Sequence, residues 1–360
     1  MTRMMRFLSF AFSLGFFGIS NLANAQNPVD SLNGPMPYGT YQGSDIDRVD
    51  VLNGKLTVEI PLVSYPQRGH QLKVNYILRY HNTGQMFGAF STLPWDSGFQ
   101  FVAETFSVAA VGCSASYICA VQVLSPDGSI HPMDAVGPLT YRAVDGTGFR
   151  VDLPQGFPLS SDPSYTLIDS DGVRRIHQSG VPDVIEDVNG NKLTSSDSLG
   201  RVFPPFSGFP VPFPAPFPSG LTGQTTDYSG CTGSLPVVSA LAWSPPGLAG
   251  INSGTYPLKF CFITISETTC CDPYTGQPYT GVQANQLQSV VLPNGSTWTF
   301  QYATDGTGNL SQITLPSGGT ISYTWINPSY TGYPPYAAMP FAVATRTLNP
   351  NDGTPPEVWH

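Results

Sequence analysis

The chain has 360 residues, enough for one large β domain or two ordinary domains, and its 41% hydrophobic and 12% aromatic residues can fill a core. Charged residues make up 11%, well below the roughly 25% of an average domain, while Gly and Pro, at 37 and 35 residues, stay below the roughly 25–30% typical of low-complexity chains. The formal net charge of −9 argues against nucleic acid or an anionic membrane surface as a partner.

Residues 1–25 have the pattern of a secretory signal peptide. Arg3 and Arg6 precede an apolar run at 7–19, and Ala23–Ala25 supplies a small-residue cleavage site. The run is too short to span a membrane, and no later stretch is long enough. We therefore expect an exported chain, secreted or at the cell surface, with no membrane span and with a net charge of −11 once Arg3 and Arg6 are removed.

After an irregular lead-in at 26–50, two stretches predict the first β-hairpin. Apolar residues alternate with polar ones over 56–62 and again over 72–80. A period of two is typical of half-buried strands, and a turn-forming segment separates the two stretches. We expect residues 26–202 to form an N-terminal β region.

Residues 203–220 have a different composition, in which Phe and Pro alternate without any charged residue. Seven prolines exclude a helix or a central strand, so this segment is predicted to be a polyproline-like spacer. It separates the N-terminal region from a second β region at 221–360. No amphipathic helix is predicted in either region.

The second region contains the same pattern twice, at 287–302 and 310–325, with an offset of 23 residues. Each copy is a short apolar strand, a Pro-containing turn closed by Gly, and a return strand with alternating aromatics. We read each copy as a hairpin with one apolar face, which needs a neighbour to cover it. The aromatic stripe of 298–302 and 323–325 is interpreted as core, although an exposed stripe would be a platform for sugar rings.

Weaker copies of the pattern lie before and after these two, and each turns at a glycine. Residues 123–133 match the spacing of Val290, Pro293, Gly295 and Phe300, and residues 347–360 look like another copy cut in mid-strand. If the glycines have positive φ, Val in place of Gly295 or Gly318 should be strained, whereas Gly306, in an inserted loop, should tolerate the change better. The repeat-defining turn glycines are Gly128, Gly172, Gly190, Gly200, Gly295 and Gly318.

The amino-acid sequence of these copies resembles the tyrosine–aspartate (YD) repeat of bacterial RHS proteins. Gln301–Leu310 has the Tyr, Asp, Gly, Asn and aliphatic order of that repeat, and Asp187–Leu193 followed by Asp197–Val202 ends in Asp-x-x-Gly-Arg-Val. Residues 52–80 and 94–99 are similar to the segment that precedes the repeats in such proteins. The match at Gln301–Leu310 departs from the YD repeat in two ways: it has an insertion after Asp305, and it has Asn where the repeat can have Arg.

The resemblance implies an all-β fold in which consecutive antiparallel hairpins form a continuous strip of sheet, part of an RHS-type shell. In that family such strips enclose a C-terminal toxin or effector, or act in cell-surface adhesion. The chain has too few repeats to close a shell, so we expect a fragment or a piece that assembles with another chain, non-catalytic, with downstream repeats or toxin cargo as protein partner.

Six cysteines in an exported chain predict disulfides without fixing their pairing. Their spacing does not provide the paired ligands of a zinc site. The candidates are Cys113, Cys119, Cys231, Cys261, Cys270 and Cys271.

A search for catalytic and ligand-binding patterns is negative: no nucleophile elbow, zinc-protease motif or P-loop is present. His70 and His131 lie beside turns and are expected at the surface. Asp169–Gly172 is read as a turn and not a Ca²⁺ loop, because the remaining ligands of such a loop are missing. Asp272–Gly276 resembles the Asp-Pro-x-Gly at which RHS cores end and self-cleave, but it too is read as a turn. We thus predict no catalytic residue, metal or cofactor.

A second hypothesis is a secreted carbohydrate-binding or adhesive β protein that contacts cell-surface glycans. It depends on exposed aromatic side chains, for which Tyr330, Tyr333 and Tyr336, set among prolines, are the candidates. A secreted hydrolase is a third, supported only by export.

Overall fold

The computed structural model describes residues 41–52, 54–67, 69, 72–82, 98–103, 106–111, 120–125, 129–154, 164–178, 181–194, 196–197, 199, 201, 211–212, 222–245, 258–269, 279–326 and 341–360. Every regular element within these ranges is a β-strand, which confirms the predicted all-β class. The first strands are β1 (Tyr41–Gly43), β2 (Asp47–Asp50), β3 (Leu56–Pro66), β4 (Lys73–His81), β5 (Gly98–Ala103), β6 (Ser107–Val111), β7 (Ala120–Leu124), β8 (Ile130–Ala135), β9 (Thr140–Ala143), β10 (Arg150–Asp152), β11 (Tyr165–Ile168) and β12 (Arg174–Gln178). The others are β13 (Val181–Glu186), β14 (Lys192–Leu193), β15 (Val211–Pro212), β16 (Thr222–Thr225), β17 (Ser239–Trp243), β18 (Leu258–Thr269), β19 (Tyr279–Val291), β20 (Thr297–Tyr302), β21 (Leu310–Thr314), β22 (Thr320–Ile326), β23 (Ala342–Asn349) and β24 (Glu357–Trp359).

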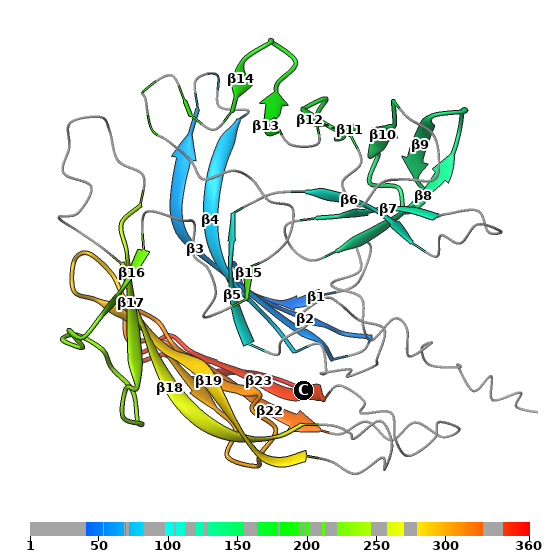
Figure 1. Ribbon diagram of the computed structural model, residues 1–360. Helices are drawn as coiled ribbons and strands as arrows, with labels where there is room; N and C mark the ends of the chain where they lie inside the picture. The colour runs from blue at the N-terminus through cyan, green and yellow to red at the C-terminus, as the bar shows by residue number, and fades with distance from the viewer. Residues whose placement is uncertain are drawn as a thin grey trace, which may run out of the picture.

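The strands form three antiparallel sheets (Figure 1). The N-terminal sheet has the order β1-β2-β3-β4-β5-β15, the middle sheet runs from β14 back to β6, and the C-terminal sheet runs from β16 to β24. Apart from β15, strands that lie side by side within a sheet are consecutive in the chain, as expected for consecutive hairpins.

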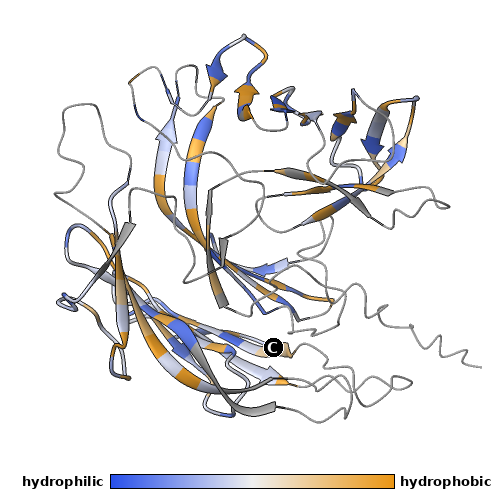
Figure 2. Cartoon of the chain, in the orientation of Figure 1, coloured by the Kyte–Doolittle hydropathy of each residue, from blue (hydrophilic) through white to orange (hydrophobic). Residues whose placement is uncertain are grey.

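The first predicted hairpin is β3 and β4, with Ile60 opposite Leu78. Ile60, Tyr76, Leu78 and Tyr80 are fully buried, and polar residues alternate with apolar ones along β4 (Figure 2). The alternation in the sequence therefore predicted which face of this hairpin enters the core.

The Phe/Pro-rich segment contributes one short strand, β15, whose Val211 and Pro212 pair with Phe101 and Gln100 of β5. It lies at the end of the N-terminal sheet. Proline cannot donate a ladder hydrogen bond, so an edge strand is the place where the sheet can accept it.

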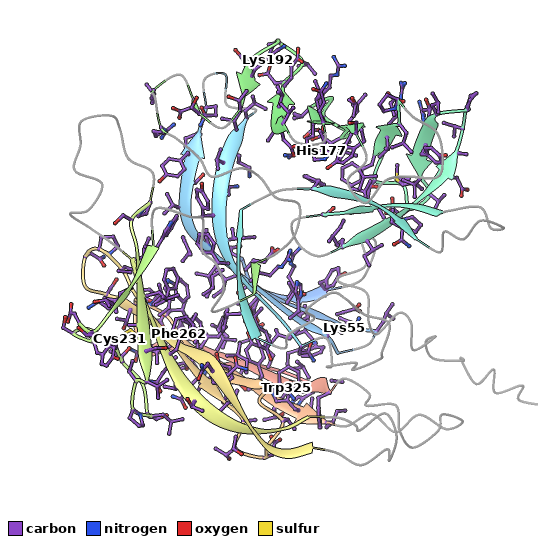
Figure 3. The ribbon with its side chains drawn as sticks, viewed as in Figure 1. Lys55, His177, Lys192, Cys231, Phe262 and Trp325 are labelled. Atoms are coloured by element: carbon purple, nitrogen blue, oxygen red, sulfur yellow. A yellow bond between two sulfur atoms is a disulfide. The ribbon has the colours of Figure 1, made fainter. Side chains whose placement is uncertain are left out.

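The N-terminal and C-terminal sheets pack face to face around a shared core. Phe99 and Phe300 have ring centroids 4.2 Å apart, and Trp243 lies 5.1 Å from Tyr76 and 4.9 Å from Phe101. Figure 3 shows side chains filling the space between the two sheets near Phe262 and Trp325. The result is a β-sandwich built from segments on both sides of the Phe/Pro-rich segment.

The middle sheet has its own hydrophobic cluster, which includes Val123, Val151 and Leu167. Its last strands touch the sandwich, because Ile185 and Leu193 belong to the sandwich core. The range 26–202 thus contributes to two separate cores.

Candidate functional site: repeat hairpins and the interface between two sheets

One hairpin register occurs five times in the part of the chain that the structure describes. In each, two directly opposed residues lie eight positions apart, and a glycine follows the first by five positions. The opposed pairs are Val123–His131, Leu167–Arg175, Ile185–Leu193, Val290–Trp298 and Ile313–Ile321. The weak copy at 123–133 therefore has the same register as the two clear copies.

The turn explains why glycine is needed. In the copy at 290–298, the Leu292 N–H donates to the Ser296 carbonyl (2.8 Å) and the Gly295 N–H donates to the Leu292 carbonyl (2.9 Å). Gly295 has φ of +83°, and Gly318 in the next copy has φ of +92°. This is a type I turn followed by a left-handed residue, which glycine adopts without steric strain.

The other predicted turn glycines fall into two groups. Gly172 and Gly190 have φ of +80° and +79°, whereas Gly128 and Gly200 lie outside the described residues. Gly306 also has a positive φ, +85°. The expectation that Gly306 tolerates valine better is therefore revised, since a β-branched residue at this φ is strained for the same steric reason as at Gly295 and Gly318.

The aromatic stripe faces the core. Phe300 and Tyr323 are 1% and 4% exposed, and Trp298, Tyr302 and Trp325 pack against the same cluster. This supports the core interpretation of the stripe.

The last aromatic of each copy closes its own repeat. The Tyr302 hydroxyl donates to the Leu287 carbonyl (2.6 Å), and the Trp325 indole N–H donates to the Leu310 carbonyl (2.9 Å). Both pairs are separated by 15 residues. The 23-residue offset thus relates hydrogen bonds as well as sequence.

A disulfide attaches the loop between β16 and β17 to the C-terminal sheet. This loop lies against the face of that sheet opposite the sandwich core. Cys231 is bonded to Cys261 of β18, with a Cα–Cα distance of 5.9 Å, and Figure 3 shows Cys231 at the margin of that sheet. Gln288 of β19 both accepts from the Leu235 N–H and donates to the Leu235 carbonyl, at 2.9 Å each. The other four cysteines lie outside the described residues.

A buried ion pair joins the two sheets of the sandwich. Asp47 of β2 receives hydrogen bonds from Arg346 Nε (2.6 Å) and Nη2 (2.8 Å) on β23, and from the Tyr323 hydroxyl (2.8 Å) on β22. The Arg346 and Asp47 side chains are 3% and 0% exposed.

The charges of this group follow from its contacts. Burial by itself would raise the pKa of Asp47, but hydrogen bonds from Arg346 and Ser44 hold it below its usual value. Burial and the Asp47 charge raise the pKa of Tyr323 well above its usual value. Asp47 is therefore ionised and Tyr323 neutral at neutral pH. We call the side chains of Asp47, Tyr323 and Arg346 the interface clamp.

Backbone contacts continue the interface on both sides of the clamp. The Leu310 N–H donates to the Tyr80 hydroxyl (3.0 Å), and the Asn82 side chain donates to the Phe341 carbonyl (2.6 Å). The Val343 N–H donates to the Gly54 carbonyl (2.8 Å). The N-terminal sheet thereby holds the first residue of the second repeat copy.

The middle sheet contains a polar group that the sequence search did not find. Ser125 Oγ lies 2.5 Å from His131 Nε2, and His131 Nδ1 lies 2.7 Å from Asp145 Oδ2. His131 is 3% exposed, so the prediction that it lies at the surface was wrong. Its position beside a turn did not reveal its orientation, because the histidine replaces an apolar side chain on the inner face of the hairpin.

The candidate Asp169–Gly172, which lies within the described residues, forms a turn. Asp169 Oδ1 accepts the Val173 backbone N–H (2.9 Å), as a turn former does. Among the described residues, no group of three or more His, Cys, Asp or Glu side chains is placed to hold a metal ion. In the same part of the chain, no helix is long and apolar enough to cross a membrane. Residues 272–276 and Tyr330, Tyr333 and Tyr336 lie outside the described residues.

Comparison with known proteins bears on the repeats. No curated protein matches the chain. Residues 283–320, which span β20 and β21 with most of β19 and the turn into β22, match the family model described as RHS Repeat. Together with the repeated hairpin, this shows that residues 283–320 are similar to an RHS repeat.

Proposed function

We propose that this chain is a structural segment of an RHS-repeat protein, whose hairpin strip forms part of a shell around a toxin or effector encoded elsewhere. The observation that supports the proposal most is the RHS repeat at 283–320, set in the sheet that runs without interruption from β16 to β24. Such a sheet grows by adding one hairpin after another, each held by its neighbour.

The location of the aromatic residues of the repeat favours a scaffold. The aromatic side chains of the repeat pack against the sandwich core, and two of them, Tyr302 and Trp325, donate hydrogen bonds within the repeat. A glycan-binding role would need such rings to be exposed, so the described residues favour the structural proposal over it.

Export is part of the same proposal. The Cys231–Cys261 bond is of a kind that persists in oxidising compartments. We propose that residues 1–25 direct secretion and that the mature protein acts outside the cytoplasm or at the cell surface, as RHS-repeat proteins typically do.

The test is protection of a cargo. The coding sequence that follows His360, or a neighbouring gene, is searched for RHS repeats and a toxin-like segment, and the products are co-expressed with this chain. A shell predicts a stable complex in which the cargo resists protease while the free cargo is digested. The control is a chain carrying Asp47→Asn, which removes the negative charge of the interface clamp and leaves Arg346 without its ionic partner. Digestion of the cargo at the same rate with and without this chain would contradict the proposal.

A further inference from the structure

The copy of the hairpin at 123–131 differs from the two clear copies at the positions that face the core. At these positions those copies have the partly buried Leu292 and Trp298, and the partly buried Leu315 with the buried Ile321. At the equivalent positions this hairpin has Ser125 and His131, which are 8% and 3% exposed. Burying polar groups is unfavourable unless they are hydrogen-bonded, and the fold forms elsewhere with apolar residues at these positions. The hairpin itself therefore does not require a serine and a histidine.

The third member of the group comes from the next strand connection. Asp145 follows β9, and its Oδ2 accepts from His131 Nδ1 at 2.7 Å. Its other oxygen accepts the Thr147 backbone N–H (3.0 Å) and hydroxyl (2.5 Å). Burial alone would raise the pKa of Asp145, but the bonds from Thr147 and His131 lower it, so the group is a carboxylate.

A carboxylate at Nδ1 fixes the imidazole tautomer. Nδ1 carries the proton that is donated to Asp145, which leaves Nε2 as an acceptor. The atom 2.5 Å from Nε2 is the Ser125 hydroxyl oxygen, so Ser125 donates its proton to that nitrogen. The serine hydroxyl, the imidazole and the carboxylate are thus hydrogen-bonded in a row, through Nε2 and Nδ1 of the imidazole. A serine nucleophile, its general base and the carboxylate that orients the base are connected in the same way.

Aromatic rings shield the imidazole from one side. Phe149 packs edge-on against His131 with centroids 4.7 Å apart, and Phe106 packs against Phe149 at 5.4 Å. Ser125 is 8% exposed and His131 is 3% exposed. Because so little of either side chain is exposed, an electrophile that reacts with Ser125 must be small.

We infer that Ser125 is a nucleophile toward short-chain acyl esters, with His131 as its general base and Asp145 as a positioning residue. Ser125 Oγ forms a bond to the ester carbonyl carbon and passes its proton to His131 Nε2. The bond from that carbon to the alkoxide breaks, and the alkoxide takes the proton from His131. Water then attacks the acyl-serine, its proton passes through His131 to Ser125 Oγ, and the carboxylic acid leaves. This activity goes beyond the structural role proposed above and does not depend on it.

The experiment uses the full exported chain and two probes, an alkyl fluorophosphonate and 4-nitrophenyl acetate. Covalent adducts are mapped by mass spectrometry of peptides, and labelling rates are measured. We expect an adduct on Ser125 that disappears in Ser125→Ala and forms at least about a hundredfold more slowly in His131→Gln. Ser129→Ala, in the same turn, is the matched control and should label like the unaltered chain.

Two further variants separate chemistry from structure. Asp145→Asn should slow labelling at least about tenfold, and Asp145→Glu should restore part of it, because a carboxylate and not mere packing sets the tautomer. The pair Ser125→Leu with His131→Ile copies the apolar residues of the hairpin at 313–321 and should fold without labelling. The inference is overturned if the folded unaltered chain gives no Ser125 adduct, or if His131→Gln labels at the same rate.

Discussion

Removing the charge of Asp47 tests whether the interface clamp holds the two sheets together. Asp47→Asn keeps the size of the side chain but leaves the Arg346 guanidinium buried beside a neutral amide. Because the two side chains are 0% and 3% exposed, solvent cannot compensate that charge. Breaking a buried pair from one side costs about 3–5 kcal/mol, a large part of the roughly 5–15 kcal/mol that stabilises a domain.

The assay is equilibrium unfolding in urea followed by tryptophan fluorescence. Four of the five tryptophans, Trp243, Trp298, Trp325 and Trp359, lie in strands of the C-terminal sheet, so most of the emitting side chains report on the sandwich. Arg346→Met should lose a similar free energy of unfolding to Asp47→Asn. The double variant should lose much less than the sum, because the second change removes the unpaired charge left by the first.

The control is Arg48→Gln, which breaks the ion pair with Glu59. These side chains are 37% and 24% exposed, so the change should cost less than about 1 kcal/mol. If Asp47→Asn costs no more than this control, or if the two clamp changes are additive, the clamp does not couple the sheets.

The remaining predictions concern the turns, the disulfide and acid. Valine at Gly295, Gly318 or Gly306 should lower the free energy of unfolding by more than about 1 kcal/mol in each case, since all three have positive φ; a small shift at Gly306 alone in thermal melts would contradict this. Cys231→Ser should cost about 2–5 kcal/mol, matched by reductant on the unaltered chain, and equal urea midpoints with and without reductant would exclude a stabilising bond. Because the pKa of Asp47 is lowered in the folded state, its contribution is complete above the unfolded pKa and is lost as pH falls from about 5 through the folded pKa. Unfolding free energies measured from pH 6 to 3 should therefore fall more steeply for the unaltered chain than for Asp47→Asn.

The sequence by itself determined the local structure. Alternation over 56–62 and 72–80 defined the first hairpin and its buried face, since side chains of a strand alternate between its two sides. The 23-residue offset predicted two hairpins of equal register, and the Gly295 and Gly318 turns follow from steric limits on φ. Such features depend on residues close together in the chain, so a short window contains all the information.

The unusual hairpin could have been found from that same register. Aligning Val123 with Val290 places Ser125 and His131 where Leu292 and Trp298 stand, a polar pair at two core positions. Asp145 has no counterpart in the pattern, because it belongs to a separate turn that the sheet brings beside the hairpin. The sequence thus contained two members of the group and no indication of the third.

Tertiary structure alone decided how the sheets meet. Asp47 and Arg346 are 299 positions apart, and neither belongs to a repeated pattern. The pairing of Cys231 with Cys261, and the packing of Phe99 on Phe300 across the Phe/Pro-rich segment, likewise depend on where complete sheets settle. Packing between sheets is driven by apolar area, which is non-directional, so many arrangements satisfy the same hydrophobic pattern until the folded chain selects one.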